Sequence, residues 1–256
     1  MDREASERTR RLVGEEAFAR IEKARVLVMG LGGVGSWCAE ALARAGVGAI
    51  GLLDRDVVSR SNLNRQLCAL SSTIGRRKTE VVRERLLDVN PALRAVVYDL
   101  SYGPETADSV PLADWDFVVD AIDQVSAKVL LAVRARDAGV RLVSAMGGGN
   151  KLDATRFRAA DLSKTDRCPL AAVMRKKLRR LGIRHGTAVF SDEEPRVPFS
   201  APGEETGRHV PPGTLPTVVG AEGLVLAQTV LAEIVGPPAA PRVCEARDKA
   251  RTGRSR

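Results

Sequence analysis

A glycine-rich turn is the first part of the sequence with a clear chemical use. The residues Gly30-Leu-Gly-Gly-Val-Gly35 follow an apolar run at 25–29 and open a helical pattern. Glycines allow the backbone to approach a phosphate closely, and a helix N-terminus adds partial positive charge. Asp54 ends the next apolar run, where a carboxylate can accept hydrogen bonds from ribose hydroxyls. The combination predicts a nucleotide site; the alternative is a glycine turn that only packs a helix on a sheet.

The loop after Asp54 carries cations and amides that suit ATP better than a nicotinamide cofactor. A triphosphate attacked at its α-phosphorus builds negative charge on its oxygens, and cations stabilise that charge. Arg65 offers a planar fork to phosphate oxygens, and Lys78, at the start of a predicted helix, offers a compact charge. Each alone is typical of an ordinary surface, so the prediction depends on their position behind the turn. The residues expected to contact the nucleotide are Gly30, Gly32, Gly33, Gly35, Asp54, Asp56, Asn62, Arg65, Gln66 and Lys78.

Two acids, Asp120 and Asp123, follow another apolar run at 117–119. Ligands of open α/β sheets bind at the carboxyl ends of the strands, and a carboxylate there can hold Mg²⁺ against phosphates. Asp123 lies further out and is the better candidate for a metal ligand. It completes the predicted catalytic set with Arg65 and Lys78. The alternative role for either acid is to cap the helix that we expect to begin near Val125.

The elements that must position these residues alternate along the chain. We expect strands at 25–29, 49–53, 95–98, 117–119, 141–145 and 187–190, and helices at 15–22, 33–45, 76–89, 125–138, 169–181 and 218–235. Strands that are almost entirely apolar are typical of a parallel sheet covered on both faces. The chain is therefore predicted to be an α/β protein with a Rossmann-like, doubly wound, mostly parallel sheet and an irregular C-terminal extension.

The chain has the length of one decorated domain, 256 residues. We expect that domain to span 1–236, with a nucleotide-binding core at 10–150 and a substrate or crossover part at 151–236. Prolines, glycines and charges at 194–216 predict a mobile crossing loop, and 237–256 reads as a basic disordered tail.

Charge and cysteine content restrict the partners and the compartment. The net charge is +8, which favours anionic partners, and a basic tract at 175–180 makes RNA plausible beside the simpler reading of a solvated helix face. The four cysteines form no CxxC pair, which argues against a zinc ribbon and a disulfide framework. The N-terminus lacks an apolar signal core, and the apolar run at 224–235 is too short to span a bilayer. These features predict a cytoplasmic protein that does not enter the membrane. The candidate RNA-binding residues are Arg175, Lys176, Arg179 and Arg180.

Over most of residues 10–150 the chain resembles the E1-like ATP-dependent adenylating family. The segments that carry the resemblance are RVLVMGLGGVGSWCAEALARAGVGAIGLLDRDVVSRSNLNRQ, GRRKTEVVRERLLDVNP and VVDAIDQVSAK. Within that family the chain is most similar to the branch that dehydrates threonylcarbamoyladenosine in tRNA, through SAMGGGNKLDATRFRAADLSKTDRCPLAAVMRKKLRRLGI and AVFSDEEP. The missing CxxC pairs fit this branch, because many activators of sulfur-carrier proteins use such pairs to hold zinc.

The resemblance implies a reaction and a set of partners. ATP and Mg²⁺ would adenylate the threonine carboxylate of the modified base in tRNA, and ring closure would then release AMP. It also implies a homodimer, in which Arg10 or Arg11 could reach the neighbour's ATP, and possible sulfur-transfer or redox partner proteins. Two alternatives remain: an adenylyltransferase that activates the C-terminal Gly-Gly of a ubiquitin-like carrier, and a nucleotide-binding module without catalysis.

Three further side chains are poor candidates for chemistry. Cys168 has no base beside it in sequence, and cyclisation needs no enzyme nucleophile, so we expect a structural cysteine rather than a thioester former. Some relatives have a cysteine where this chain has Ala188, which excludes a thiol nucleophile there. His185 and His209 lie in polar segments, where solvent exposure is the simpler expectation.

Overall fold

The computed structural model describes residues 1–199 and 212–237. Much of the predicted crossing loop, nearly all of the predicted tail, His209 and Cys244 lie outside these residues. The helices are α1 (Arg3–Val13), α2 (Glu15–Lys23), α3 (Gly35–Ala45), α4 (Lys78–Val89), α5 (Val125–Asp137), α6 (Pro169–Arg180) and α7 (Pro216–Val235). The strands are β1 (Arg25–Met29), β2 (Ala49–Leu53), β3 (Arg94–Tyr98), β4 (Phe117–Asp120), β5 (Arg141–Ala145), β6 (Phe157–Asp161) and β7 (Thr187–Ser191).

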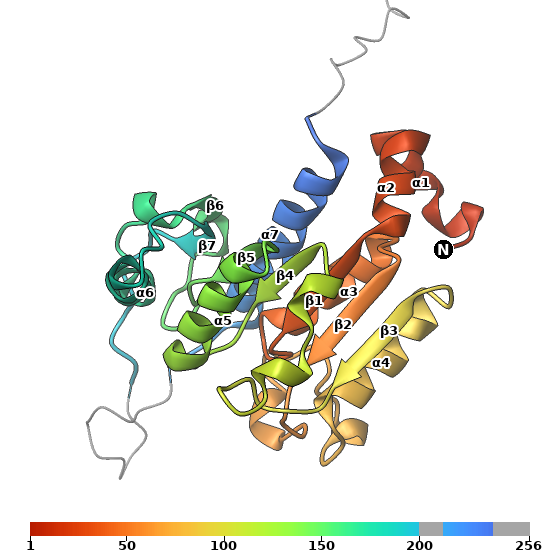
Figure 1. Cartoon of the computed structure of the whole chain (residues 1–256). Helices are drawn as coiled ribbons and strands as arrows, with labels where there is room; N and C mark the ends of the chain where they lie inside the picture. Colours follow the sequence, from red (N-terminus) through yellow and green to blue (C-terminus); the bar gives the residue numbers. More distant parts are fainter. Residues whose placement is uncertain (200–211, 238–256) are drawn as a thin grey trace, which may run out of the picture.

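These strands form one seven-stranded sheet in the order β3-β2-β1-β4-β5-β7-β6 (Figure 1). Neighbouring strands are parallel except for β6, which runs antiparallel to β7. The chain moves outward from β1 to β3 and then returns to place β4 on the other side of β1. The carboxyl ends of β1 and β4 therefore form the switch point at which ligands of doubly wound sheets bind. The predicted fold class is confirmed.

The register brings the ends of the central strands to one level. Met29 of β1 lies opposite Leu53 of β2 and Asp120 of β4, and Asp120 lies opposite Ser144 of β5. The glycine turn, Asp54 and Asp123 begin one to three residues after these strand ends. Sheet register alone therefore places the glycine turn, Asp54 and Asp123 along the same edge.

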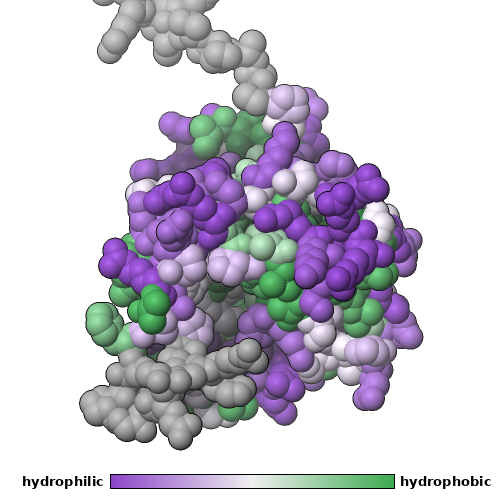
Figure 2. All heavy atoms as spheres, turned by 90° about the vertical axis from the view of Figure 1, so that its left-hand side faces the viewer, coloured by the Kyte–Doolittle hydropathy of each residue, from purple (hydrophilic) through white to green (hydrophobic). Residues whose placement is uncertain are grey.

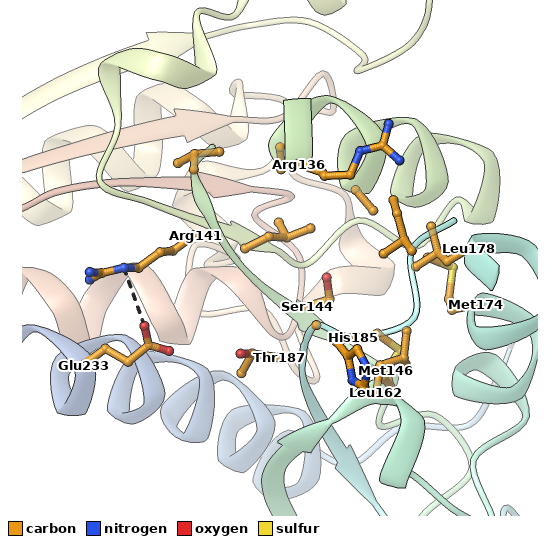
Figure 3. A pocket seen from close by; sticks show the side chains of 16 residues that line it. Arg136, Arg141, Ser144, Met146, Leu162, Met174, Leu178, His185, Thr187 and Glu233 are labelled. Carbon is orange, nitrogen blue, oxygen red and sulfur yellow. Dashed lines mark ion pairs between the residues drawn. The ribbon is translucent and has the colours of Figure 1, made fainter. Parts of the chain in front are cut away.

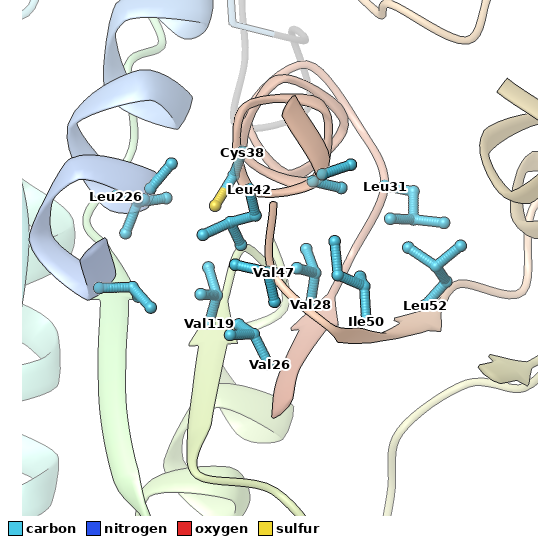
Figure 4. Packing of buried hydrophobic residues seen from close by; sticks show 14 of the residues in the cluster. Val26, Val28, Leu31, Cys38, Leu42, Val47, Ile50, Leu52, Val119 and Leu226 are labelled. Atoms are coloured by element: carbon cyan, nitrogen blue, oxygen red, sulfur yellow. The ribbon is translucent and has the colours of Figure 1, made fainter. Parts of the chain in front are cut away.

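Two apolar layers cover the sheet because its strands are apolar on both sides. On one face α3, α4 and α7 pack on β1, β2 and β4 through Cys38, Leu42 and Leu226, among others (Figure 4). On the other face α5 and the segment 100–115 cover the middle of the sheet, and α6 covers β7. Both layers isolate the sheet from water and leave its carboxyl edge as the place where polar side chains can gather.

Helix α7 extends beyond the apolar run at 224–235 that we judged too short to span a bilayer. Its length and composition would allow it to cross a membrane, so our argument from length was wrong. Half of its apolar stretch is nevertheless buried inside the protein, and the helix packs against α3 and the sheet (Figure 1). Packing of this kind is typical of a core helix.

Two elements were missing from the prediction, α1 and β6. The strongly charged α1 buries only Ser6, so no apolar stripe marks it, and its helix begins at an N-cap where Asp2 accepts the Ala5 N–H. Strand β6 is a half-exposed edge strand that pairs only with β7. Hydrophobic periodicity has little to detect in either element.

Candidate active site

The glycine-rich turn connects β1 to α3 at the switch point. Gly30 has a φ of +90°, and a Cβ there would lie 2.6 Å from the carbonyl oxygen of Ala121, at the end of β4. A Cβ on Gly35 would lie 1.8 Å from the carbonyl oxygen of Gly30. These two glycines are needed for the turn to close against β4 and start the helix. Gly32 and Gly33 are partly exposed and form its outer surface.

Asp54 joins the turn to the end of β2. Its carboxylate accepts the Leu31 N–H at 2.7 Å and the Asp56 N–H at 2.8 Å. Both oxygens keep lone pairs that can accept further hydrogen bonds. The residue thus fixes the turn and the following loop while its half-buried carboxylate remains able to meet ribose hydroxyls.

The loop after β2 folds back over the glycine turn. The Arg65 stem lies against Gly33, where a Cβ would meet Arg65 Cγ at 3.3 Å, and the Gln66 amide lies beside Gly32. Of the three guanidinium nitrogens of Arg65, Nη1 alone donates a hydrogen bond to a residue within 1–199 and 212–237. Its acceptors are Ser61 O and Asn64 Oδ1. The other guanidinium donors are therefore available to phosphate oxygens.

Asn62 and Lys78 hold this loop in place. Asn62 is buried, and its Oδ1 accepts the Ser59 N–H at 3.1 Å. Lys78 begins α4 with a side chain that is 5% exposed, and its Nζ contacts Asp56 Oδ2 at 2.8 Å. An ammonium has three donors, so Lys78 can pair with Asp56 and still donate to a phosphate.

The two acids after β4 have different surroundings. Asp120 is fully buried and pairs with Lys128 of α5 at 2.9 Å, and Lys128 Nζ also donates to Ile122 O. Asp123 is exposed, and the N-cap of α5 is Gln124 without a side-chain cap bond. The capping alternative for Asp123 is therefore wrong. In the described ranges, no three His, Cys, Asp or Glu residues gather at one metal-sized site.

The carboxyl end of β5 adds a group that the sequence did not suggest. The Gly147 N–H donates to Glu222 Oε1 of α7 at 2.9 Å, and Glu222 is fully buried. Burial raises the pKa of Glu222 to about 7. The signal that could have identified it is an acid between apolar residues in the first half of an apolar helix.

The basic tract lies on α6, away from the glycine turn. Together with η6 (Leu162–Lys164) and the turn after the helix, it borders an open hollow of about 810 Å³. Figure 2 faces this side of the molecule, where hydrophilic side chains gather in clusters. Arg175 is held by the Thr165 carbonyl at 2.7 Å. The cations that line the hollow are Arg175, Lys176, Arg179, Arg180 and Arg184.

Cys168 and His185 occupy positions that fit our expectations. Cys168 is buried at the N-cap of α6, and its Sγ donates to the Met146 carbonyl at 3.1 Å. His185 is exposed, with Nδ1 3.2 Å from Asp161 Oδ2. Neither contacts the glycine turn or the loop over it.

A more enclosed cavity of about 290 Å³ lies between α5, α6 and the first residues of β5 and β7 (Figure 3). Its walls are mostly apolar, with Met146, Met174 and Leu178 among them. None of the residues predicted to bind nucleotide or metal lines it. The cavity is therefore not the candidate active site.

The N-terminal arginines differ in what they contact. Arg10 is bound within its own chain, to Glu15 at 2.5 Å and Glu22 at 3.3 Å, and its guanidinium lies over the Phe18 ring. The Arg11 side chain is 76% exposed, and its one ion pair within residues 1–199 and 212–237 is with Glu7, one helical turn away. Arg11 is therefore the one of the two that can extend to another molecule.

The fold and the carboxyl edge of its sheet define a doubly wound α/β protein. A glycine-rich turn lies at its switch point, and a cationic loop covers that turn. The chain belongs to the ThiF family, whose model matches residues 6–251.

Three similar proteins, two by sequence and one by structure, share one activity in their names. The tRNA threonylcarbamoyladenosine dehydratase of Bacillus subtilis is 38% identical over 232 residues, which cover 87% of this chain and 91% of that protein. The enzyme of the same name from Escherichia coli is 42% identical over 171 residues, covering 67% of this chain and 64% of that protein. A crystal structure of the E. coli dehydratase TcdA in complex with ATP has a TM-score of 0.79 and 36% identity, over 91% of this chain and 94% of that one.

Proposed function

We propose that this protein is an ATP-dependent dehydratase that cyclises N6-threonylcarbamoyladenosine in tRNA. A carboxylate oxygen of the modified base attacks the α-phosphorus of ATP, and pyrophosphate leaves. The neighbouring carbamoyl group then attacks the acyl carbon, a five-membered ring closes, and AMP leaves with the carboxylate oxygen. In the net reaction the base loses the elements of water, and ATP is converted to AMP and pyrophosphate. The names of the relatives support the substrate, and the Arg65 side chain against Gly33 is the observation that supports the chemistry.

The residues at the switch point divide the work of the first step. The turn from Gly30 to Gly35 and the start of α3 receive the phosphates, and Asp54 binds the ribose. The guanidinium of Arg65 and the ammonium of Lys78 stabilise the charge that builds during attack at phosphorus. Asp56 keeps Lys78 at the loop, at 2.8 Å. Asn62 and Gln66 fix the loop and line the nucleotide.

The carboxylate of Asp123 fits a magnesium ligand. It is exposed at the end of β4 and does not cap α5. Mg²⁺ bound with ATP would neutralise charge on the phosphate oxygens. Replacing Asp123 with Asn should raise the Mg²⁺ concentration that gives half-maximal pyrophosphate release; an unchanged requirement would remove this role.

The second step needs mainly proximity, because the nucleophile and the acyl centre belong to the same base. No enzyme thiol is required, and the burial of Cys168 agrees with that. The residues at 1–236 would act as one adenylating domain, in which 10–150 bind nucleotide and 151–236 contribute to the substrate side. We place the enzyme in the cytoplasm, where sulfur-transfer or redox proteins could be its partners.

Recognition of tRNA would involve α6. A second subunit would complete the nucleotide site. The hollow beside α6 is lined by Lys176, Arg179 and Arg180, which suit the phosphate backbone of RNA. In a homodimer, the exposed Arg11 could reach the neighbour's ATP and add positive charge at the phosphates.

Release of pyrophosphate from ATP with Mg²⁺ tests the proposed function. Three substrates are compared: tRNA that carries the modified base, the same tRNA without it, and a ubiquitin-like carrier that ends in Gly-Gly. Only the modified tRNA should stimulate release. AMP transfer to the carrier would instead establish the carrier adenylyltransferase, and nucleotide binding without release in all three reactions would leave a non-catalytic module.

A further inference from the structure

Asn64 joins the loop after β2 to the segment that precedes α7. Its side-chain oxygen Oδ1 accepts a hydrogen bond from Arg65 Nη1 at 2.9 Å. Its side-chain nitrogen Nδ2 donates to the Thr214 carbonyl oxygen at 3.3 Å, across 150 positions of sequence. One amide group therefore contacts both the arginine of the candidate active site and a distant part of the chain.

The chemistry of the two partners allows only one orientation of this amide. A guanidinium group only donates hydrogen bonds, and a carbonyl oxygen only accepts them. If the Asn64 amide turned over, its nitrogen would face Arg65 and its oxygen would face the Thr214 carbonyl, so both hydrogen bonds would be lost. The contact with Arg65 is thus coupled to the contact with Thr214.

Asn64 also completes the hydrogen bonding of Nη1 in Arg65. Nη1 has two N–H groups, and its second acceptor is the Ser61 carbonyl at 3.0 Å. With Nη1 bound on both sides, the plane of the guanidinium has one orientation. Its remaining donors, on Nε and Nη2, then point in a fixed direction.

Asn150 holds the segment to which Asn64 is bound. Its Oδ1 accepts the Gly213 N–H at 2.7 Å, and its own N–H donates to the Gly213 carbonyl at 2.7 Å. Its carbonyl accepts the Arg196 N–H at 2.7 Å. Asn150 has a φ of +61°, in the left-handed region that asparagine adopts more readily than most residues. One residue after β5 therefore fixes the chain at 196 and at 213.

The first turns of α7 complete this arrangement at the glycine-rich turn. A Cβ on Gly33 would lie 3.0 Å from Val219 Cγ2 and 3.3 Å from Arg65 Cγ. The Arg65 stem and the start of α7 therefore meet at the same glycine. The stem of Arg65 is held by this packing, and its guanidinium is held by Asn64.

We propose that Asn64 is a positioning residue for Arg65: it orients the guanidinium toward the phosphates of ATP, and it does so from the segment that Asn150 holds. The inference rests on the proposed function for the role of Arg65. An arginine side chain that is not held has many rotamers, and ordering it on each phosphate would weaken binding and catalysis. The phosphate site would then depend on residues 213 and 214 as well as on the core at 10–150.

Equilibrium binding of ATP to the full chain tests the positioning without any tRNA. Asn64→Ala should raise the Kd for ATP about fivefold, the effect of one hydrogen bond, and should leave the Kd for adenosine unchanged because adenosine has no phosphate. Ser61→Ala is the matched control, since it removes an exposed hydroxyl and keeps the carbonyl that accepts Nη1. It should bind ATP as wild type does. An unchanged Kd for ATP in Asn64→Ala, or an equal loss for adenosine, would overturn the proposal.

A double-mutant cycle shows whether Asn64 acts through Arg65. In an Arg65→Ala background, Asn64→Ala should have no further effect on the Kd for ATP, because no guanidinium remains to be oriented. Additive losses would refute the positioning role.

The same cycle with Asn150→Gly tests the more distant part of the link. This change keeps the left-handed backbone and removes the side-chain acceptor of the Gly213 N–H. It should raise the Kd for ATP about threefold in wild type and leave it unchanged in Arg65→Ala. A threefold loss in both backgrounds would remove Asn150 from the link.

Pyrophosphate release tests the link in the reaction. With modified tRNA and saturating ATP, Asn64→Ala should lower kcat about fivefold, since Arg65 acts on charge that builds in the transition state. An unchanged kcat would refute orientation toward the reacting phosphate. If wild type releases no pyrophosphate with modified tRNA, the proposed function fails, and the binding experiments alone decide on Asn64.

Discussion

Arg65 is held in place by parts of the chain that are distant in sequence. Its stem lies against Gly33, its carbonyl oxygen accepts the Trp37 indole N–H at 3.3 Å, and Nη1 is bound within its own loop. Residue types and spacing predicted Arg65 beside the glycine turn, because a fork-shaped cation there can bind phosphate; its stem does lie against that turn, and its contact with phosphate stays a prediction. Spacing could not reveal Trp37, since its role depends on how the loop folds back over α3.

Arg65→Ala should remove charge stabilisation at phosphorus and leave the fold intact. We expect the rate of pyrophosphate release to fall by about 10²–10³, the usual loss when one preorganised donor is removed. Arg60→Ala is the matched control, because Arg60 is an exposed arginine of the same loop. Equal losses in both variants would show that Arg65 has no special contact with ATP.

Glu222 should also leave a pH signature on stability. Its pKa of about 7 lies above the ordinary value of 4.5, so the folded protein binds the proton more tightly than the unfolded chain does. The free energy of unfolding therefore falls as pH rises from about 4.5 to about 7, by about 3 kcal/mol for this group. Glu222→Gln lacks this term. Urea unfolding at pH 4 and pH 8 should show the variant gaining that amount relative to wild type; a constant difference contradicts the assignment.

At the scale of elements, the sequence predicts what is apolar and periodic. The strands from β1 to β5 begin and end within a residue of the predicted bounds, since each is built around a short apolar run with polar residues on either side. The antiparallel β6 could not be found in this way, because three-dimensional pairing with β7 defines it. The charged α1 was missed because the contacts that stabilise it are ion pairs, such as Arg10 with Glu15, which leave no apolar pattern in the sequence.

The contact of α7 with α3 depends on a glycine. A Cβ on Gly223 would lie 2.3 Å from the Val34 carbonyl oxygen and 2.9 Å from Trp37 Cβ. Gly223→Ala should push the helices apart and destabilise the protein by about 1–3 kcal/mol, as overpacking does. Leu224→Ala is the control, because Leu224 is 50% exposed on the same helix and should change stability by less than about 0.5 kcal/mol. Urea denaturation measures both, and a neutral Gly223→Ala would show that the helices are not in close contact.

At the scale of the whole molecule, the two outer edges of the sheet lie next to helices of different net charge. The edge with β7 and β6 adjoins the basic α6, and the opposite edge adjoins α4. Arg179→Glu with Arg180→Glu should weaken tRNA binding and reduce the slope of log Kd against log salt by roughly one to two. Arg83→Glu with Arg94→Glu makes the same change of charge with exposed residues at the other edge. If both double variants change the slope equally, net charge rather than α6 governs binding.

If each active site of a homodimer uses arginines from both subunits, mixing two inactive variants should restore activity. Arg11→Ala and Arg65→Ala should each be inactive as pure proteins if Arg11 acts on the neighbour's ATP. When the two are mixed and allowed to exchange subunits, half of the dimers contain one chain of each kind, and one of their two sites has both arginines. The mixture should recover about a quarter of the wild-type rate of pyrophosphate release. If Arg11 instead acts within its own chain, every site in the mixture lacks one arginine, and mixing restores nothing. The 76% exposure of Arg11 and the binding of Arg10 within its own chain favour recovery, and Arg8→Ala, a change at an exposed arginine of the same helix, should remain active without mixing.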